Sequence, residues 1–215
     1  IKMTESWSDA NNSPETGESL PSVERFSGQW SWIDPDKKRK IFSIFVQDQF
    51  SITDRLDITA GFRYDSYDDT DNRFSPRIAG VFRISENHAF KVQYAEAFRP
   101  PSFIEMYSMN NPSVLGNPEL APEVIKTLEF GYVFRKTSFS GKLTLFHSKL
   151  EDLIGAARFD DDRVLYVNSG NAESKGTEAE LKWNISRSFT IDGNIAYAYA
   201  RDSDTDQEIQ GAANW

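Results

Sequence analysis

The 215-residue sequence contains no cysteine, which excludes disulfide bonds and metal sites built on thiolates. It also lacks any long apolar run, and with a mean hydropathy of −0.56 this excludes a transmembrane helix. A transmembrane β-barrel stays possible, because its strands alternate polar and apolar residues. Basic residues are scarce: 24 Lys and Arg against 33 Asp and Glu give a net charge of −9. This balance argues against a nucleic-acid partner, since phosphate binding needs a basic face.

Signals of catalysis are missing too. The two histidines, His88 and His147, lie far apart in the sequence and have no nucleophile or acidic partner at a recognisable spacing. There is no Gly-x-Ser-x-Gly motif, no phosphate-binding loop and no cluster of metal ligands. We therefore expect no enzymatic activity, no cofactor, and no catalytic or metal-binding residues.

Three acidic stretches, at 65–71, 160–162 and 202–208, carry the hard oxygen ligands that calcium prefers. The last of them lacks the Gly at the sixth position and the Glu at the twelfth position of an EF-hand loop. We interpret all three as solvated loop tips, and calcium binding is the alternative.

Alternation of polar and apolar residues is the clearest local pattern that is present. From Arg55 to Asp65 the even positions are apolar and the odd positions are mostly polar. The same pattern recurs at 90–98, 127–135 and 189–199. Several of the predicted segments approach the length that a tilted membrane strand needs. The predicted strands are 40–52, 55–66, 74–84, 89–98, 124–135, 138–149, 163–184 and 189–200.

The connections between these strands alternate as well. Tight polar turns are predicted near residues 53–54, 85–88, 135–138 and 186–188, and longer loops at 2–38, 66–73, 99–123, 149–162 and from 201 onwards. Short turns on one rim and long loops on the other are typical of outer-membrane barrels. No helical period is visible. The sequence predicts an all-β, antiparallel, up-and-down transmembrane β-barrel segment; a soluble β-sandwich would show the same alternation.

One passage, Tyr94 to Glu123, breaks this rhythm with prolines and aromatic residues. It contains Arg99-Pro100-Pro101 and Gly116-Asn117-Pro118, and a strand with Glu129 and Gly131 follows it. This order closely resembles the middle of the barrel in TonB-dependent outer-membrane receptors, where F-R-x-P-x-x-x-E-x-Y, G-N-P-x-L-x-P-E and T-x-E-x-G recur. The residues at motif positions are Pro100, Pro101, Gly116, Asn117, Pro118, Glu119, Leu120, Pro122, Glu123, Glu129, Gly131, Asn168, Gly176 and Glu178.

Further stretches carry the same resemblance across residues 40–200. They include the Gln47-Asp48 pair with the strand at 56–65, the Ser-Pro-Arg at 75–77, and the segment at 175–181. The resemblance implies that residues 1–215 are a partial barrel domain, about eight strands of a barrel of about 22. It also implies that the plug domain of the family is absent from this chain.

The resemblance implies a function as well. We expect part of a multi-pass protein of the bacterial outer membrane that imports a metal chelate with TonB energy: a ferric siderophore first, haem or cobalamin next. The implied partners are the iron–siderophore chelate, the TonB complex through the absent plug, and outer-membrane lipid with lipopolysaccharide. The alternatives are a passive outer-membrane pore and a soluble β-sandwich adhesin or lectin.

Candidate ligand-binding residues lie where the Pro-rich passage enters its loop. Arg99 could face an anionic chelate, with Phe103, Glu105 and Tyr107 shaping the vestibule; Tyr107 would stack on the ligand. The alternative is architectural: the two prolines stiffen the loop base and Glu105 pairs with Arg99. Two tryptophans, Trp30 and Trp32, are further candidates for stacking on a planar ligand, or they pack the loops together.

Overall fold

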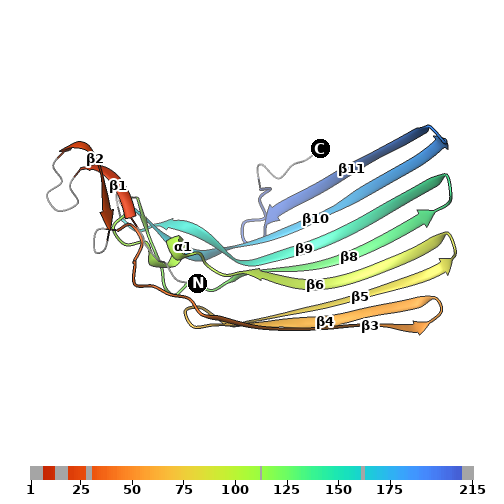
Figure 1. Cartoon of the computed structure of the whole chain (residues 1–215), viewed down its shortest axis with the longest axis horizontal. Coiled ribbons are helices and arrows are strands. Elements are labelled where there is room, and N and C mark those ends of the chain that lie inside the picture. The colour runs from red at the N-terminus through yellow and green to blue at the C-terminus, as the bar shows by residue number, and fades with distance from the viewer. Residues whose placement is uncertain (1–6, 13–18, 28–30, 112, 161–162, 210–215) are drawn as a thin grey trace.

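A computed structural model of the chain describes residues 7–12, 19–27, 31–111, 113–160 and 163–209. Its long strands are β3 (Ile41–Thr53), β4 (Leu56–Tyr67), β5 (Arg73–Ser85), β6 (His88–Arg99), β8 (Glu123–Arg135), β9 (Phe139–Arg158), β10 (Val164–Ser186) and β11 (Phe189–Asp202). They form one curved antiparallel sheet in the order β11-β10-β9-β8-β6-β5-β4-β3 (Figure 1). Strands β3 and β11 are the two edges, so the sheet is open. The predicted up-and-down barrel segment is confirmed.

The eight predicted strands are all present, and only β9 departs clearly from its predicted end. We predicted a loop at 149–162, whereas β9 runs to Arg158. The extension pairs with β10 across register shifts between Asn168 and Ala172, and Asp152 takes a left-handed φ of 57°. Because bulges interrupt the two-residue alternation, the sequence pattern ends before the strand does.

The predicted loops also contain short elements. A hairpin of β1 (Trp7–Asn12) and β2 (Ser19–Ser27) lies within the predicted loop at 2–38. Helix α1 (Phe103–Tyr107) follows β6, and β7 (Val114–Leu115) runs parallel to the start of β10. These elements lie at one end of the sheet (Figure 1). Each is too short, or too irregular in sequence, to show a period of its own.

No helix in the described residues is long and apolar enough to span a membrane.

The two rims differ as predicted. Two- or three-residue turns join β3 to β4, β5 to β6, β8 to β9 and β10 to β11 at one end of the sheet (Figure 1). The longer connections, including residues 100–122 with α1 and β7, lie at the other end. We call these ends the turn rim and the loop rim.

One face of the sheet is apolar and exposed. Phe50 on β3 lies beside Ile58 on β4, and Val92, Phe130 and Leu145 continue this row through β6, β8 and β9. The exposed fractions of Phe50, Val92, Phe130 and Leu145 are 42–48%. In the described part of the chain no second sheet of long strands packs on this face, unlike the two packed sheets of a β-sandwich. We call this surface the apolar belt; burying it requires an apolar surrounding.

Candidate functional site

Helix α1 begins with a capping box at the point where β6 ends. The Ser102 Oγ accepts a hydrogen bond from the Glu105 N–H at 3.3 Å, and a Glu105 carboxylate oxygen accepts one from the Ser102 N–H at 2.6 Å. Pro100 and Pro101, just before it, have no N–H to donate to a strand partner. The local sequence therefore stops the strand and starts the helix at one defined place.

Arg99, the last residue of β6, joins this helix to two strands. Its Nη1 and Nη2 donate to the two Glu105 oxygens at 2.9 and 3.0 Å, and its Nε donates to Glu123 Oε2 at 2.6 Å. The Glu123 Oε1 in turn accepts from the Ile154 N–H of β9 at 2.8 Å. Burial raises the pKa of Glu105, but hydrogen bonds from Arg99 and Ser102 outweigh it and hold that pKa below its usual value.

A small apolar core lies next to this network. Met106, Tyr107 and Leu120 are only 1%, 8% and 2% exposed. The half-buried side chains that pack against them are Ile33, Phe103, Ile154 and Tyr166. The core therefore brings together α1, the returning chain before β8, the approach to β3, and both β9 and β10. We call the Arg99 network and this core the loop base.

A buried ion pair that the sequence did not reveal completes the loop base. Arg39, 5% exposed, donates through Nε to both Asp69 oxygens at 2.7 and 2.9 Å and through Nη1 to the Pro101 carbonyl at 2.8 Å. The Tyr107 hydroxyl donates to Asp69 Oδ2 at 3.0 Å. Burial, with this hydrogen bond, raises the pKa of Tyr107 to about 12. Asp69 belongs to the acidic stretch at 65–71, which the sequence predicts to be a solvated loop tip. That prediction is wrong at Asp69, because the side chain is 10% exposed and paired with Arg39.

Motif residues pin the returning chain to the sheet. A Cβ on Gly116 would lie 2.4 Å from the Ser108 backbone nitrogen, so the close approach requires glycine. The Asn117 side chain donates to a β10 carbonyl at 3.0 Å. The Asn168 side chain accepts from the Ala121 N–H and donates to its carbonyl, both at 2.9 Å. These three hydrogen bonds act within the chain.

The motif residues on β8 and β10 lie on the polar face of the sheet. Glu129 and Glu178 carry charge there, next to Gly131 and Gly176. A Cβ on Gly176 would lie 2.1 Å from a β11 carbonyl oxygen and 2.7 Å from the Phe146 ring. Glycine is therefore required where Phe146 covers β10. Of the remaining motif residues, Pro122 is buried, while Pro118 and Glu119 are exposed.

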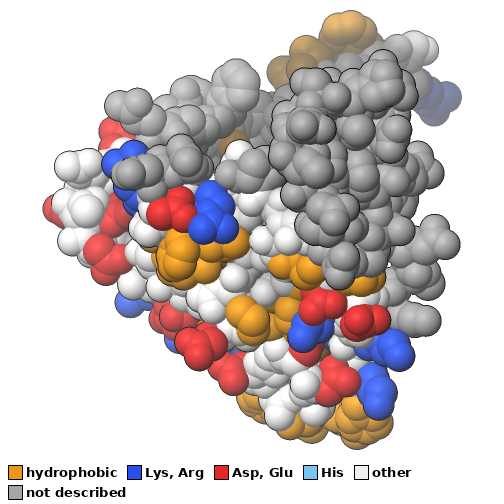
Figure 2. Space-filling model, turned by 90° about the vertical axis from the view of Figure 1, so that its left-hand side faces the viewer, with side chains coloured by type: hydrophobic (Ala, Val, Ile, Leu, Met, Phe, Trp, Pro, Cys, Tyr) orange, Lys and Arg blue, Asp and Glu red, His pale blue; other side chains and the backbone are white. Residues whose placement is uncertain are grey.

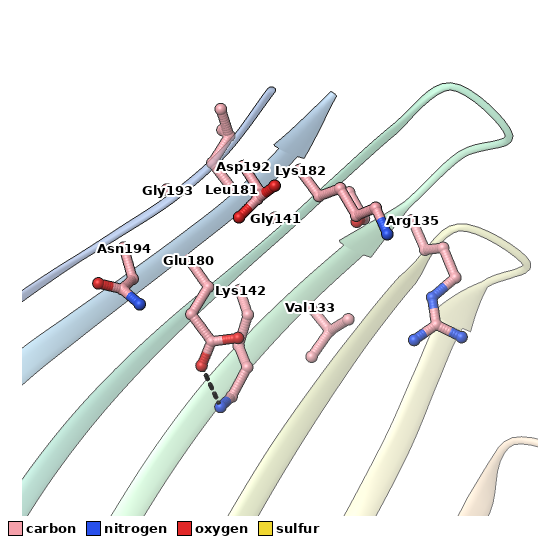
Figure 3. A pocket seen from close by; sticks show the side chains of 11 residues that line it. Val133, Arg135, Gly141, Lys142, Glu180, Leu181, Lys182, Asp192, Gly193 and Asn194 are labelled. Carbon is pink, nitrogen blue, oxygen red and sulfur yellow. Dashed lines mark hydrogen bonds and ion pairs between the residues drawn. The ribbon is translucent and has the colours of Figure 1, made fainter. Parts of the chain in front are cut away.

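A polar depression of about 420 Å³ lies on the same face near the turn rim (Figure 3). Arg135, Lys142, Glu180, Lys182 and Asp192 line it, and Lys142 Nζ pairs with Glu180 Oε1 at 2.9 Å. Side chains of both charge signs face this open space. Such a surface suits a polar protein segment or water rather than an apolar ligand.

A second depression, of about 660 Å³, lies beside the loop base. Pairing between β5 and β6 ends at Arg77 and Ala95, and the opening above is lined in part by Phe45, Arg63 and Tyr67. Phe45 is 58% exposed. Arg77 contacts no acceptor within the described residues. Sequence reasoning missed this group because its members come from different strands.

The predicted ligand-binding residues do not all lie together: four lie in the loop base, and Trp32 does not belong to it. Arg99, Phe103, Glu105 and Tyr107 meet in the loop base, where Arg99 is paired with two carboxylates and Tyr107 is buried. Trp32 is 40% exposed nearby, and its carbonyl accepts from the Met109 N–H at 3.0 Å. Trp30 lies outside the described residues. Contact between these residues and a ligand stays a prediction.

Each acidic stretch contains at least one aspartate that is paired with a basic side chain. Arg163 binds Asp160 at 2.7 Å and Arg201 binds Asp206 at 2.6 Å. Viewed from the loop rim, acidic and basic side chains lie next to each other among apolar ones (Figure 2). Within the described residues no group of three or more His, Asp or Glu side chains could hold a metal ion.

The model of the "TonB dependent receptor-like, beta-barrel" family matches residues 3–215. The chain belongs to the TonB-dependent receptors. The resemblance predicted from the motifs is thereby confirmed, and so is the expectation that the chain is a receptor segment and no enzyme.

Named relatives agree with this membership. The chain is 25% identical over 174 residues to the iron-regulated outer membrane virulence protein of Vibrio cholerae, covering 73% of this chain and 27% of that protein. It is 26% identical over 195 residues to the heme/hemopexin utilization protein C of Haemophilus influenzae, covering 74% and 27%. The solved siderophore receptor PirA of Acinetobacter baumannii shares the fold, with a TM-score of 0.72 at 19% identity over 80% of this chain and 29% of that one. The chain thus spans somewhat more than a quarter of each of these proteins.

Proposed function

We propose that this chain is part of the barrel wall of a bacterial outer-membrane receptor that imports a metal chelate with TonB energy. One observation carries the proposal: a single open sheet of long strands has an exposed apolar face and a polar, charged face. A wall between lipid and an aqueous lumen needs this division of faces. The strands would cross the membrane repeatedly, with the loop rim outside and the turn rim in the periplasm.

A ferric siderophore is the proposed cargo. Relatives carry the names ferrienterobactin receptor (Escherichia coli) and siderophore receptor PirA, which support it. Haem and cobalamin follow, because other relatives are named for heme/hemopexin utilization and vitamin B12 transport. The depression beside the loop base supports the same class, since exposed Phe45 and the Arg77 guanidinium group would suit an aromatic, anionic chelate.

The loop base has a different proposed role. Arg99, Glu105 and Glu123 hold the mouth of the barrel open in one shape, and the ligand touches the rim around them. Residues 1–215 would supply wall and loop surface only. The plug domain that TonB pulls would come from another part of the whole protein and would pack against the polar face, including the depression at Lys142 and Glu180.

The first test is an immunoblot of outer-membrane fractions from the source bacterium, boiled and unboiled, with antibody against this chain. We expect a heat-modifiable band far heavier than 24.5 kDa, followed by loss of ferric-siderophore uptake when the gene is deleted. A band near 24.5 kDa would contradict the proposal and favour a passive pore. Uptake that persists without TonB would contradict the energised mechanism.

A further inference from the structure

An opening in the sheet separates β5 from β6 near the loop rim. Cross-strand pairing between these two strands ends at Arg77 and Ala95, although both strands continue toward the loop rim. At the end nearer that rim, the rings of Tyr67 and Phe98 meet edge to face, with their centroids 6.1 Å apart. The depression of about 660 Å³ beside the loop base occupies the space between these two limits. We call it the wall opening.

Pro76 explains why the pairing stops. The Arg83 N–H donates to the Arg55 carbonyl at 2.7 Å, so odd-numbered residues of β5 direct their backbone groups toward β4 and even-numbered residues toward β6. Pro76 therefore stands where the ladder to β6 needs an N–H, which proline lacks; the continued register places Glu96 opposite it. In the described chain, backbone groups beyond this point have no ladder partner across the opening. Open sheet edges are not tolerated in lipid, so a polar group has to fill the wall opening.

The residues that line the wall opening come from both faces of the sheet. Phe62 is four residues from Ile58 on β4, so it lies on the face of the apolar belt. By the same alternation Phe98 lies on that face of β6. Arg77 lies opposite Gly61, the neighbour of Phe62 in β4, and therefore on the polar face. The wall opening thus connects the apolar belt with the polar face.

The charged groups of the wall opening differ between its two sides. On the polar side Arg77 is exposed, and no acceptor contacts it within the described residues. The guanidinium of Arg63, also on that side, is paired with Asp65 at 2.7 Å. On the belt side the Glu96 carboxylate accepts a hydrogen bond from the Tyr94 hydroxyl at 2.5 Å. An anionic group therefore fits the polar side, and an uncharged apolar group fits the belt side.

We propose that the wall opening binds an acylated metal chelate, in which an amide joins the chelating head to a fatty acyl chain. The anionic head binds on the polar face at Arg77, and the acyl chain lies on the apolar belt. The amide lies in the opening, where its donor and acceptor pair with the backbone groups of β5 and β6 that the ladder leaves over. A volume of about 660 Å³ is in the range of small-molecule sites. This inference rests on the proposed function and names its substrate class.

The test uses the whole receptor that carries this chain, in lipid nanodiscs, and reads dissociation constants from the quenching of intrinsic fluorescence. The probes are the ferric complexes of one hydroxamate chelator in an N-lauroyl and an N-acetyl form, which share the head and the amide. Pro76→Val supplies the missing N–H, so that β5 pairs with β6 beyond Arg77 and the opening closes. A methylene that leaves water gains about fourfold in affinity. With about three methylenes in the opening, the ratio of the N-acetyl to the N-lauroyl dissociation constant should fall by about sixtyfold in this variant.

The matched control is Ile78→Val, on the same strand and the same face, at a residue that already pairs with Tyr94. It should keep the ratio of the unaltered receptor. Partitioning of the acyl chain into the nanodisc lipid is the same for every variant and does not affect the comparison. A second variant, Ala97→Trp, fills the wall opening from the polar side and should also lower the ratio. The heat-modifiable band shows that each variant is folded.

The inference is overturned if the unaltered receptor binds the two forms equally. It is also overturned if neither Pro76→Val nor Ala97→Trp lowers the ratio, or if Ile78→Val lowers it as much. In each of these cases the N-acetyl form still binds, so the proposed function stands. A receptor that binds neither form contradicts the proposed function, and the inference fails with it.

Discussion

Replacing Arg39 by methionine should open the loop base. In the native chain Arg39 is 5% exposed and its partner Asp69 is 10% exposed, and their nitrogen and oxygen atoms are 2.7 Å apart. Methionine roughly fills the volume but leaves the Asp69 carboxylate buried with only the Tyr107 hydroxyl as a described side-chain donor. Removing one partner of a buried ion pair typically costs about 3–5 kcal/mol. The cost falls on the opening of the loop base rather than on the whole barrel.

Hydrogen exchange read by mass spectrometry measures this opening in the whole receptor. A cost of about 3 kcal/mol corresponds to a rise of more than about a hundredfold in the open population, so peptides covering 102–120 should exchange faster by that factor. The control is Lys142→Met, which breaks a pair whose side chains are 46% and 54% exposed and is worth about 1 kcal/mol or less. Unchanged exchange in Arg39→Met would refute the buried-pair argument. Combining Arg39→Met with Asp69→Asn removes the stranded charge and should slow the exchange again. Exchange in the double variant as fast as in Arg39→Met alone would also refute the argument.

Four further outcomes are expected. Gly176→Ala should weaken the β10–β11 pairing and reduce the heat-modifiable folded band, whereas Gly193→Ala, whose Cβ meets nothing within 4 Å, should not. Ile195→Arg, at a side chain 69% exposed on the apolar belt, should destabilise the receptor in lipid vesicles by about 2–4 kcal/mol in denaturant titrations. Because the pKa of Tyr107 is raised to about 12, its contribution to stability is complete below pH 10 and is lost as the pH rises toward 12. Thermal unfolding of Tyr107→Phe should lack this alkaline loss. Arg77→Gln should weaken ferric-siderophore binding in a fluorescence titration without changing the unfolding midpoint.

The strands were predictable from the sequence because alternation is a local property. Each of the eight strands has one apolar and one polar face, and the turn residues between them are polar, so boundaries fell within two residues nearly everywhere. The exception is informative. In β9 the bulge at Asp152 shifts the side-chain phase, so the alternation of polar and apolar residues stops there. The sequence pattern therefore predicts an end of the strand that comes too early.

The loop base was predictable only in part. The Arg99–Glu105 pair is six residues apart along the chain, and the architectural alternative anticipated it. Arg39 and Asp69 are 30 residues apart and stand beside other charged residues, so only the fold distinguishes the buried pair from its solvated neighbours. The depression around Phe45 and Arg77 is equally non-local, because strand pairing brings its members together.

The motif residues make their hydrogen bonds within the chain, and this bears on which residues would determine ligand specificity. The polar groups of Arg99, Glu105 and Glu123 are taken up by one another and by backbone donors, and Asn117 and Asn168 bind carbonyls of the same chain. Polar groups that are already hydrogen-bonded within the chain stabilise the same conformation of the loop base whichever ligand is present. Under the proposed function, discrimination between chelates needs side chains at the rim whose hydrogen-bonding groups no other protein group occupies. The Arg77 guanidinium, which contacts no acceptor among the described residues, fits this description. Under the proposed function, the motif therefore builds the mouth of the barrel, and the choice of ligand falls to the residues around it.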